Sequence, residues 1–234
     1  MAKRIAVFQS NYLPWKGYFD LINSVDEFVL DDDVQYTKQS WRNRNIIKTP
    51  GGLMWLTVPV HFQFPMKINQ VAVSGSEWRR KHWRAVESNY RRAPGWKLFG
   101  EELFRMWQSA DQTMLSAVNR HCLDTICRLM EIGTPFRRSE ELQVSGDRNQ
   151  RIIAICKACG ADRLLNGPSA RQHMDEEQFR KAGIRVDYAD YSRYPEYPQL
   201  HGPFEHGVSI VDLLLCCGED FRRYVLSAPG RPAW

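Results

Sequence analysis

No stretch of this 234-residue sequence is apolar over the roughly 20 consecutive positions that a membrane-spanning helix needs. The first apolar run, at residues 5–8, ends at Gln9 and is too short for the core of a secretory signal. We therefore expect a cytoplasmic protein without a membrane span.

Familiar catalytic and nucleotide-binding signatures are absent as well. The sequence contains no GxGxxG, no GxxxxGK[ST] and no GxSxG motif. These motifs mark dinucleotide-binding Rossmann enzymes, P-loop NTPases and α/β-hydrolases. Their absence argues against these three classes, and no internal repeat or low-complexity linker divides the chain.

The cysteines do not form a metal-ligand pattern. Cys156 and Cys159 form a CxxC, but no second ligand pair accompanies them, and His201 and His206 lack a convincing third ligand. All six cysteines lie in apolar helical patterns, at positions 122, 127, 156, 159, 216 and 217. We expect buried, reduced thiols and no metal site, and we assign no cofactor.

Apolar and aromatic residues are plentiful. Hydrophobic residues make up 43% of the sequence and aromatic residues 12%, including 8 Trp, which is enough to build a core without disulfides. The 32 Lys and Arg against 27 Asp and Glu give a formal charge of +5. This excess suits an anionic partner such as a phosphate, a nucleotide or RNA, without requiring one.

Alternating strand and helix patterns predict an α/β protein with a parallel-sheet core. A strand at residues 3–8, a helix at 17–23 and a strand at 27–30 form a first βαβ unit, and residues 35–48 form a polar loop. Further strands are expected at 55–60, 70–73, 163–165 and 185–188, and helices at 76–90, within 97–133, and at 149–159, 175–182 and 209–216. We predict one domain over 1–234, with its α/β core at about 1–75 and 145–220 and a largely helical insertion at about 76–135.

Polar and aromatic residues follow the first two strands. Because a short βαβ crossover returns the second strand beside the first, we expect residues 9–18 and 31–35 to meet at one edge of the sheet, where clefts form. Asp31, Asp32 and Asp33 can bind a cation or a ligand donor there, or can simply form a solvated turn. The alternative for residues 9–18 is a connection whose aromatic residues only pack.

Three further segments carry candidate binding groups. Residues 38–45 are rich in Arg and Asn, which suits a phosphate or carboxylate. Residues 78–92 interleave basic and aromatic side chains, although on a helix these separate into a packed face and a solvated basic face. His82 in this helix is a general acid or base or, equally, a structural histidine. Residues 194–199 contain two prolines and are expected to be extended.

Together these motifs resemble the WbqC-like protein family. The resemblance covers nearly the whole chain and is carried by Gln9, Asn11-Tyr12, Pro14-Trp15, Gly17-Tyr18-Phe19, Asp32-Asp33-Val34-Gln35-Tyr36, Trp41-Arg42-Asn43-Arg44-Asn45, Trp55-Leu56-Thr57-Val58-Pro59-Val60, Trp78, Lys81-His82, Tyr90, Gly160-Ala161, Gly167, Gly183-Ile184, Tyr197-Pro198-Gln199 and Ser209-Ile210-Val211-Asp212. The family usually has His and Pro in a His-Gln-Pro-Asn-Tyr run, where this sequence has Phe8 and Ser10. If that His is catalytic in the relatives, this protein works differently.

The resemblance implies a role in bacterial surface-polysaccharide biosynthesis, often the assembly of the O-antigen of lipopolysaccharide. It implies a transferase that attaches an acyl or aminoacyl group, such as glycyl, to an amino sugar. The expected partners are a nucleotide-linked amino sugar and an activated acyl donor, with an aminoacyl-tRNA as an alternative donor.

A looser similarity links the chain to nucleotidylyltransferase-like enzymes, the group that includes pantoate–β-alanine ligase. Those enzymes begin their first helix with a His-x-Gly-His run, whereas this sequence has Trp15-Lys16-Gly17-Tyr18 and neither His. The similarity implies a sheet core of that type and offers an ATP-dependent ligase or nucleotidyltransferase as an alternative function. A non-catalytic sugar- or nucleotide-binding module is the third hypothesis.

The transferase hypothesis assigns roles to particular residues. Asp33 or His82 is the base that takes a proton from the sugar amine, Asn11 is the remaining catalytic candidate, and Arg42 with Arg44 clamps a diphosphate. The substrate-binding candidates are Gln9, Tyr12, Trp15, Gly17, Tyr18, Asp32, Gln35, Lys38, Trp41, Asn43, Arg44, Lys81, Tyr197 and Gln199.

Overall fold

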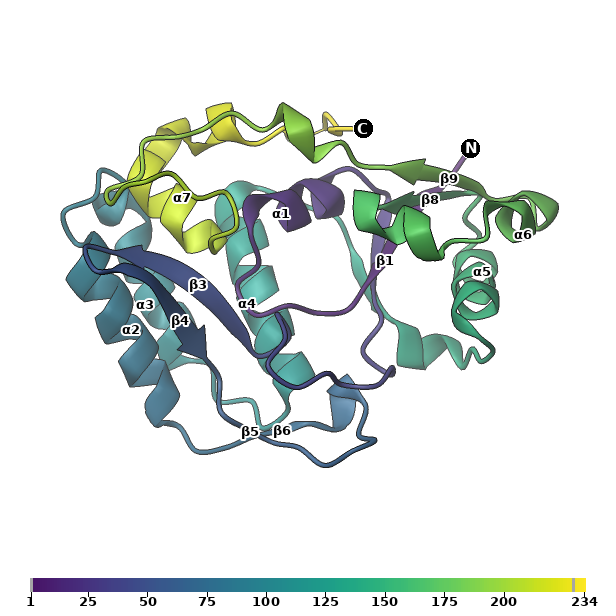
Figure 1. Ribbon diagram of the computed structural model, residues 1–234, viewed down its shortest axis with the longest axis horizontal. Coiled ribbons are helices and arrows are strands. Elements are labelled where there is room, and N and C mark those ends of the chain that lie inside the picture. Colours follow the sequence, from purple (N-terminus) through teal and green to yellow (C-terminus); the bar gives the residue numbers. More distant parts are fainter. Residues whose placement is uncertain (1, 229) are drawn as a thin grey trace.

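A five-stranded parallel sheet lies at the centre of the computed structural model, which describes residues 2–228 and 230–234. Its strands run in the order β7 (Phe136–Arg138), β2 (Glu27–Leu30), β1 (Arg4–Phe8), β8 (Arg163–Asn166) and β9 (Arg185–Tyr188) (Figure 1). The chain builds outward from β1 in both directions, so the strand order reverses between β1 and β8. The predicted α/β class with a parallel core is confirmed.

Alternate residues of the strands enter two separate hydrophobic cores. Ala6 and Phe28 belong to the larger core, together with residues of α1 (Lys16–Asn23). Ile5 and Val29 belong to the smaller core, which also contains residues of α5 (Arg148–Ala158) and α6 (Glu176–Lys181). Because both faces are covered there, the inner residues of β1 and β2 are apolar on both sides. The CxxC cysteines lie in the smaller core, and burial raises the pKa of the Cys156 thiol to about 12.

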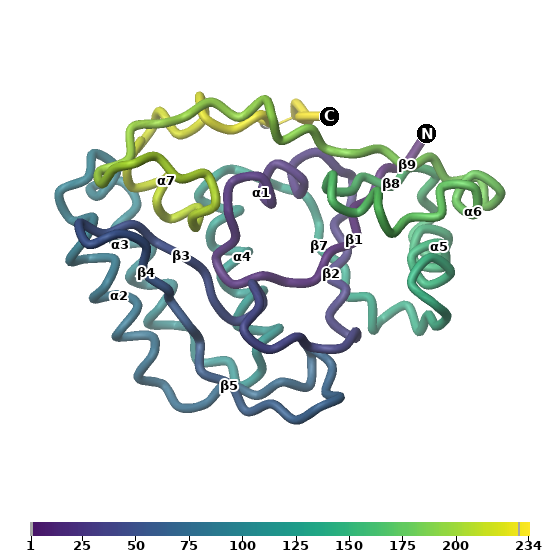
Figure 2. The backbone as a smooth tube through the Cα atoms, in the orientation of Figure 1, coloured from purple at the N-terminus to yellow at the C-terminus, as the bar shows by residue number. Residues whose placement is uncertain are grey.

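A long insertion leaves the sheet after β2 and returns at β7. It contains the antiparallel hairpin β3 (Arg44–Thr49) and β4 (Gly52–Thr57), the short pair β5 (Val60–His61) and β6 (Ala72–Val73), and the helices α2 (Glu77–Tyr90), α3 (Trp96–Gln108) and α4 (Leu115–Met130). Figure 2 shows this part of the chain, from dark blue to teal, lying beside the sheet.

The structure corrects three of the expected elements. The loop predicted at residues 35–48 ends at Arg44, where β3 begins. The strand predicted at residues 55–60 is β4, which starts earlier and pairs with β3 outside the main sheet. Strand β7 was not predicted, because three residues of which two are arginine show no strand periodicity. Its place in the sheet comes from pairing with β2.

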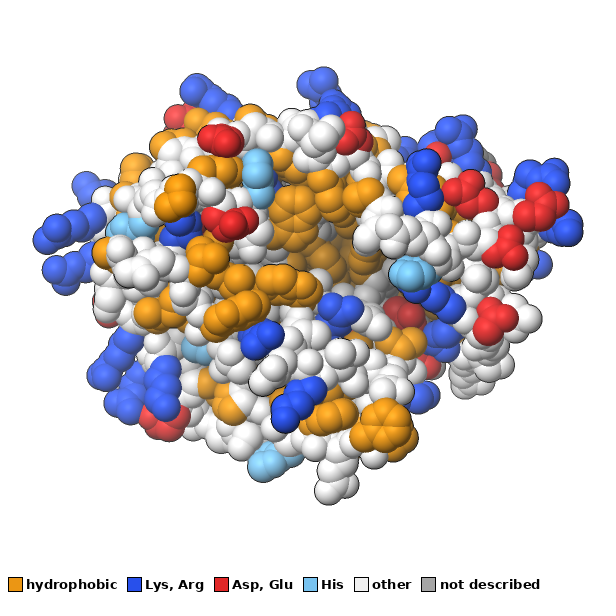
Figure 3. All heavy atoms as spheres, in the orientation of Figure 1, with side chains coloured by type: hydrophobic (Ala, Val, Ile, Leu, Met, Phe, Trp, Pro, Cys, Tyr) orange, Lys and Arg blue, Asp and Glu red, His pale blue; other side chains and the backbone are white. Residues whose placement is uncertain are grey.

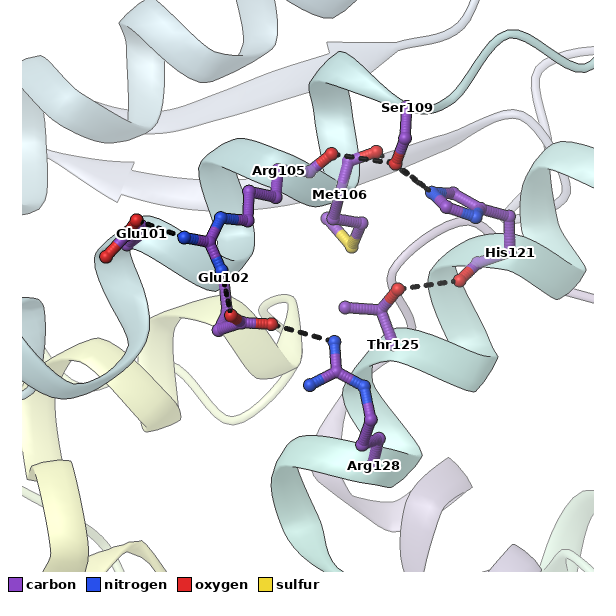
Figure 4. Close-up of polar contacts among 8 residues, drawn as sticks. All are labelled: Glu101, Glu102, Arg105, Met106, Ser109, His121, Thr125 and Arg128. Carbon is purple, nitrogen blue, oxygen red and sulfur yellow. Dashed lines mark hydrogen bonds and ion pairs between the residues drawn. The ribbon is translucent and has the colours of Figure 1, made fainter.

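Polar contacts join α3 to α4 (Figure 4). Arg128 of α4 donates to Glu102 of α3 at 2.8 Å, and Glu102 also accepts from Arg105 one turn along α3. At the other end of the contact, the His121 ring lies 3.0 Å from the backbone oxygen of Met106 and 3.3 Å from the Ser109 hydroxyl. These contacts are exposed or half-buried, so they align the helices more than they stabilise them.

The C-terminal part crosses back over the start of the chain. After β9 the chain reaches α7 (Ile210–Cys217), a buried apolar helix that packs against α3 and β3. The fully buried carboxylate of Asp20 in α1 accepts hydrogen bonds from the backbone N–H groups of Leu226 and Ser227, both at 2.9 Å. Among the described residues, no helix combines the length and apolarity that crossing a membrane takes.

Candidate functional site

The ends of β1 and β2 meet as the chain geometry predicts. The Asp31 N–H donates to the Phe8 oxygen at 2.9 Å, and the Ser10 N–H donates to the Asp32 carboxylate at 2.8 Å. Phe8 itself stacks on Phe28 with ring centroids 5.8 Å apart. The position where the family usually carries a histidine therefore points into the core of this protein.

A hollow of about 310 Å³ opens at this edge of the sheet, and we call it the central hollow. Figure 3 shows it at the middle of the molecular face, with hydrophobic side chains at its floor. Its lining comes from three loops and from the start of β3, and consists of Asn11, Pro14, Trp15, Trp41, Asn45, His206 and Gly207. Two indoles, two side-chain amides and one imidazole therefore surround a space of ligand size.

Backbone and amide hydrogen bonds hold the three loops together. The Tyr12 N–H donates to the Trp41 oxygen at 2.9 Å, and the Ile210 N–H donates to the Pro14 oxygen at 2.9 Å. Asn45 Nδ2 donates to the Leu13 oxygen at 2.8 Å. Leu13 has φ = 43°, a backbone conformation that is uncommon for residues other than glycine. This amide contact helps to hold that turn in place.

Helix α4 holds the loop after β1 and the loop that carries Arg42 through one side chain. Asn119 Nδ2, fully buried, donates to the Ser10 hydroxyl at 3.0 Å and to the Arg42 backbone oxygen at 2.8 Å. The insertion thus supplies the support on which the loop after β1 rests.

Arg42 connects the two polar residues that follow β1. Its guanidinium donates to the side-chain oxygens of Asn11, at 3.1 Å, and of Gln9. We call Arg42, Gln9 and Asn11 the donor cluster. Burial lowers the pKa of Arg42 from its usual value, although the group remains a cation at every physiological pH. Tyr18 supports the cluster from behind by donating to the Gln9 backbone oxygen at 2.9 Å.

Trp15 lies over the first turn of α1. A Cβ added to Gly17 would lie 2.2 Å from Cζ2 of the Trp15 indole, so only glycine leaves room for the ring in this position. The space that the sequence suggested for a ligand beside Gly17 is therefore filled by Trp15, whose ring forms one wall of the central hollow.

His82 is buried away from the hollow. Its Nδ1 lies 2.8 Å from the Tyr12 hydroxyl, which also accepts from Trp107 Nε1 at 2.8 Å, and its Nε2 lies 3.2 Å from the Thr57 oxygen. The hydroxyl donates to Nδ1, and the proton on Nε2 is donated to the carbonyl, so the ring is neutral. Burial lowers the pKa of His82 to about 4. Tyr12 and His82 form a structural network.

The three adjacent aspartates point in different directions. Asp31 and Asp33 both pair with Arg151 of α5, and Asp33 also accepts from the Ser139 hydroxyl. Asp32 is buried, and this burial raises its pKa to about 6. None of the three lines the central hollow.

The Arg-rich segment at residues 38–45 contributes Trp41 to the hollow and Arg44 to the hairpin of β3 and β4. Arg44 stacks over the Trp55 ring at 4.1 Å, and Trp55 in turn packs against Trp41 with centroids 5.4 Å apart. Asn43 is buried and donates to the Val58 oxygen at 3.0 Å. The side chains of Gln35, Lys38 and Lys81 are exposed and line no part of the hollow.

A second buried network positions the third loop of the hollow. Asp212 of α7 accepts from Tyr197 at 2.8 Å and from Gln199 at 3.0 Å. Gln199 also exchanges two hydrogen bonds of 2.9 Å with the backbone of Glu205. Tyr197 and Gln199 thus hold the segment that carries His206 without lining the hollow themselves.

His206 is the site residue whose role sequence reasoning missed. Its imidazole lines the hollow, and its Nδ1 is buried without a hydrogen-bond partner among the described residues. Burial and the nearby Lys16 charge lower the pKa of His206, so the ring is neutral at pH 7. The sequence offered only its distance from His201, which suggested a metal and no other role.

The predicted site residues therefore separate into groups. Asn11, Trp15 and Trp41 line the hollow, and Gln9 joins them through Arg42. Gly17 and Arg44 lie against the indole rings of Trp15 and Trp55. The remaining candidates lie in buried networks, in ion pairs or on the exposed surface. An enzyme that used Gln9, Asn11, Asp33, Asn43, Arg44 and His82 together would bring them into one pocket. Only Asn11 of these six lines the hollow.

These features define an α/β protein with a ligand-sized hollow at the carboxyl edge of a parallel sheet. The model of the WbqC-like protein family matches residues 9–224, so the chain belongs to the WbqC-like protein family. It is 43% identical over 227 residues to Uncharacterized protein Rv1507c of Mycobacterium tuberculosis (strain ATCC 25618 / H37Rv), a match that covers 95% of this chain and 98% of that protein. No solved structure gives a significant match. At the level of the family, membership supports an association with polysaccharide biosynthesis.

Proposed function

We propose that the protein is a transferase that attaches an acyl or aminoacyl group, such as glycyl, to the amino group of a nucleotide-linked sugar in surface-polysaccharide biosynthesis. The observation that carries this proposal is the lining of the central hollow. Trp15 and Trp41 offer aromatic faces, and Asn11 offers the NH₂ group of its amide. The Asn45 amide is engaged with the backbone of Tyr12, Leu13 and Ile46, so it shapes the wall of the hollow. Its volume of about 310 Å³ is at the lower end of the range of small-molecule sites, which suits a single sugar ring.

Sugar rings combine apolar C–H faces with a rim of hydroxyl groups. Indole rings cover the apolar faces with large contact area. The NH₂ group of Asn11, whose oxygen accepts from Arg42, can donate to a sugar hydroxyl. This combination supports a sugar as the occupant of the hollow.

His206 supplies the chemistry that amide formation needs. The sugar nitrogen attacks the carbonyl of an activated acyl donor, the N–C bond forms, and the bond to the leaving group breaks. The nitrogen must lose a proton in this step. His206 lines the hollow and is neutral at pH 7, so it takes this proton and passes it to the leaving group. We assign it the role that the sequence suggested for Asp33 or His82.

Mass spectrometry tests this proposal directly. The protein is incubated with UDP- or dTDP-linked amino sugars and a panel of acyl donors that includes thioesters, acyl phosphates and aminoacyl-tRNA. We expect a mass gain equal to one acyl group. The variant His206→Gln should bind the sugar and lose at least about a hundredfold in transfer rate. The absence of a mass gain with every donor would count against the proposal.

A non-catalytic sugar-binding module is the second candidate. The dispersal of the predicted catalytic residues favours it, because Asp33 and His82 do not share the hollow with Asn11. Calorimetry separates the two candidates. A protein that binds a nucleotide-linked amino sugar, loses this binding on Trp41→Ala, and transfers no acyl group is a binding module.

A further inference from the structure

Arg42 is a half-buried cation without a carboxylate partner. Among the described residues it forms no ion pair, and its two side-chain partners, Gln9 and Asn11, are neutral amides. Two other arginines that are partly removed from solvent do form ion pairs. Arg151 contacts both Asp31 and Asp33, and Arg163 contacts Asp187. Arg44 also forms no ion pair among the described residues, but its guanidinium stacks on the Trp55 ring. Removing a guanidinium from water without a counter-charge is costly, so the unpaired Arg42 suits an anion from outside the chain.

The amide orientations increase the number of free donors. A guanidinium carries only donors, so Gln9 and Asn11 must turn their oxygens toward Arg42. Their NH₂ groups then point away from it. Neither NH₂ group has an acceptor among the residues that the structure describes, and neither do the remaining N–H bonds of Arg42. The cluster therefore offers free N–H groups from three side chains. Its two acceptors, the amide oxygens of Gln9 and Asn11, are already occupied by Arg42.

The donor cluster is fixed in place and adjoins the central hollow. Asn11 belongs to both. The backbone of Arg42 is held by Asn119 at 2.8 Å, and that of Gln9 by Tyr18 at 2.9 Å. The titratable groups whose charges act on Arg42 are Tyr18, Asp32 and Tyr36, and Asp32 is engaged with the Ser10 N–H.

We propose that Arg42, Gln9 and Asn11 form a binding site for a phosphoryl oxyanion at the rim of the central hollow. Charge-assisted hydrogen bonds from an arginine fork and two amides suit the oxygens of a phosphate. The inference deepens the proposed function, because the phosphate of a nucleotide-linked sugar would lie here while its sugar lies in the hollow. It also stands as an anion site if no acyl transfer occurs.

Calorimetric titration with inorganic pyrophosphate tests the site, with UDP and malonate as parallel ligands. We expect pyrophosphate and UDP to bind the wild-type protein, and binding to weaken as ionic strength rises. The variants Gln9→Glu and Asn11→Asp keep an oxygen toward Arg42 but replace a donor by a negative charge. Each should weaken pyrophosphate binding at least about tenfold while preserving the melting temperature, because a carboxylate pairs with Arg42 internally.

A matched control separates the site from the effect of net charge. Gln172→Glu makes the same change of charge on an exposed residue outside the hollow and should leave the affinity unchanged. Arg42→Lys should also weaken binding, because lysine lacks the planar fork. Binding of malonate alone would assign the cluster to a carboxylate and overturn the phosphoryl assignment. Failure of the wild-type protein to bind pyrophosphate or UDP would overturn the site itself, whereas pyrophosphate binding without sugar transfer would count only against the proposed function.

Discussion

The ionised form of the buried Asp32 side chain destabilises the native state. Its buried carboxyl group has a pKa of about 6, against about 3.9 in an unfolded chain. Below pH 4 the group is protonated in both states, and above pH 6 it is ionised in both. As pH rises through this window, the unfolded state loses its proton first, so the native state becomes less stable by up to about 3 kcal/mol.

Asp32→Asn should therefore stabilise the protein at pH 8. The asparagine oxygen still accepts from the Ser10 N–H. We expect a gain in the free energy of unfolding on the order of 1–3 kcal/mol at pH 8 that disappears near pH 4. Urea unfolding at the two pH values measures it. A variant less stable than the wild type at pH 8 would mean that the hydrogen bonds of the carboxylate stabilise the native state more than its burial destabilises it.

His82 produces the opposite dependence on pH. Its pKa of about 4 in the native state lies below the usual 6.5, so the unfolded state takes up a proton first as pH falls from 6.5 to 4. The native state loses up to about 3 kcal/mol over this range. In the wild-type protein this contribution opposes that of Asp32. His82→Gln removes it, so the slope of stability against pH between pH 4 and 6.5 should become more negative. An unchanged slope between pH 6.5 and 4 would show that His82 does not titrate as the buried network requires.

At the scale of single elements, the start of α1 shapes the central hollow. Gly17→Ala would place a Cβ against the Trp15 indole, at 2.2 Å in the present position. Alanine favours the helix by about 1 kcal/mol, so we expect the helix to persist and the ring to move. Binding of a nucleotide-linked amino sugar should weaken at least about tenfold with little change in melting temperature, as measured by calorimetry and thermal unfolding. Binding that survives at full strength would place the sugar away from Trp15.

The strands differ in how well the local sequence pattern predicts them. Residues 4–8, 27–30 and 185–188 are short apolar or alternating runs between clear turn signals, and the strands lie where the pattern predicts them. β7 is different, since Phe136, Arg137 and Arg138 form a strand only because β2 provides a partner. The pairing of Arg42 with Gln9 and the placement of His206 likewise depend on contacts between distant segments. Local pattern therefore identified the sheet edge and Asn11, Trp15 and Trp41 near it, but not the side-chain partners of Arg42 or the role of His206.

At the scale of the whole molecule, Asp20 joins the two ends of the chain. Its buried carboxylate accepts from the N–H groups of Leu226 and Ser227 and from the Tyr194 hydroxyl. Asp20→Ala leaves these donors unpaired and should lower the free energy of unfolding by about 3–5 kcal/mol. Asp111→Ala, at an exposed residue, is the control and should change it by less than about 0.5 kcal/mol. Equal effects of the two substitutions on chemical unfolding would contradict this role of Asp20.

The long insertion between β2 and β7 also affects the order in which the sheet assembles. β1 and β2 are joined by one short helix, and so are β8 and β9, so each pair closes a small loop. β7 reaches β2 only after a chain loop of roughly 100 residues has closed, and it then pairs on a single side. The pairing of β8 with β1 closes a longer loop still, so the two edge strands provide the comparison. We expect the amide protons of β7 to gain protection later than those of β9, which pairs with β8 across a small loop, in pulse-labelling hydrogen exchange during refolding. The pairing of β7 with β2 thus forms late. Folding intermediates of this protein should therefore expose the edge of β2, which can then pair with other chains.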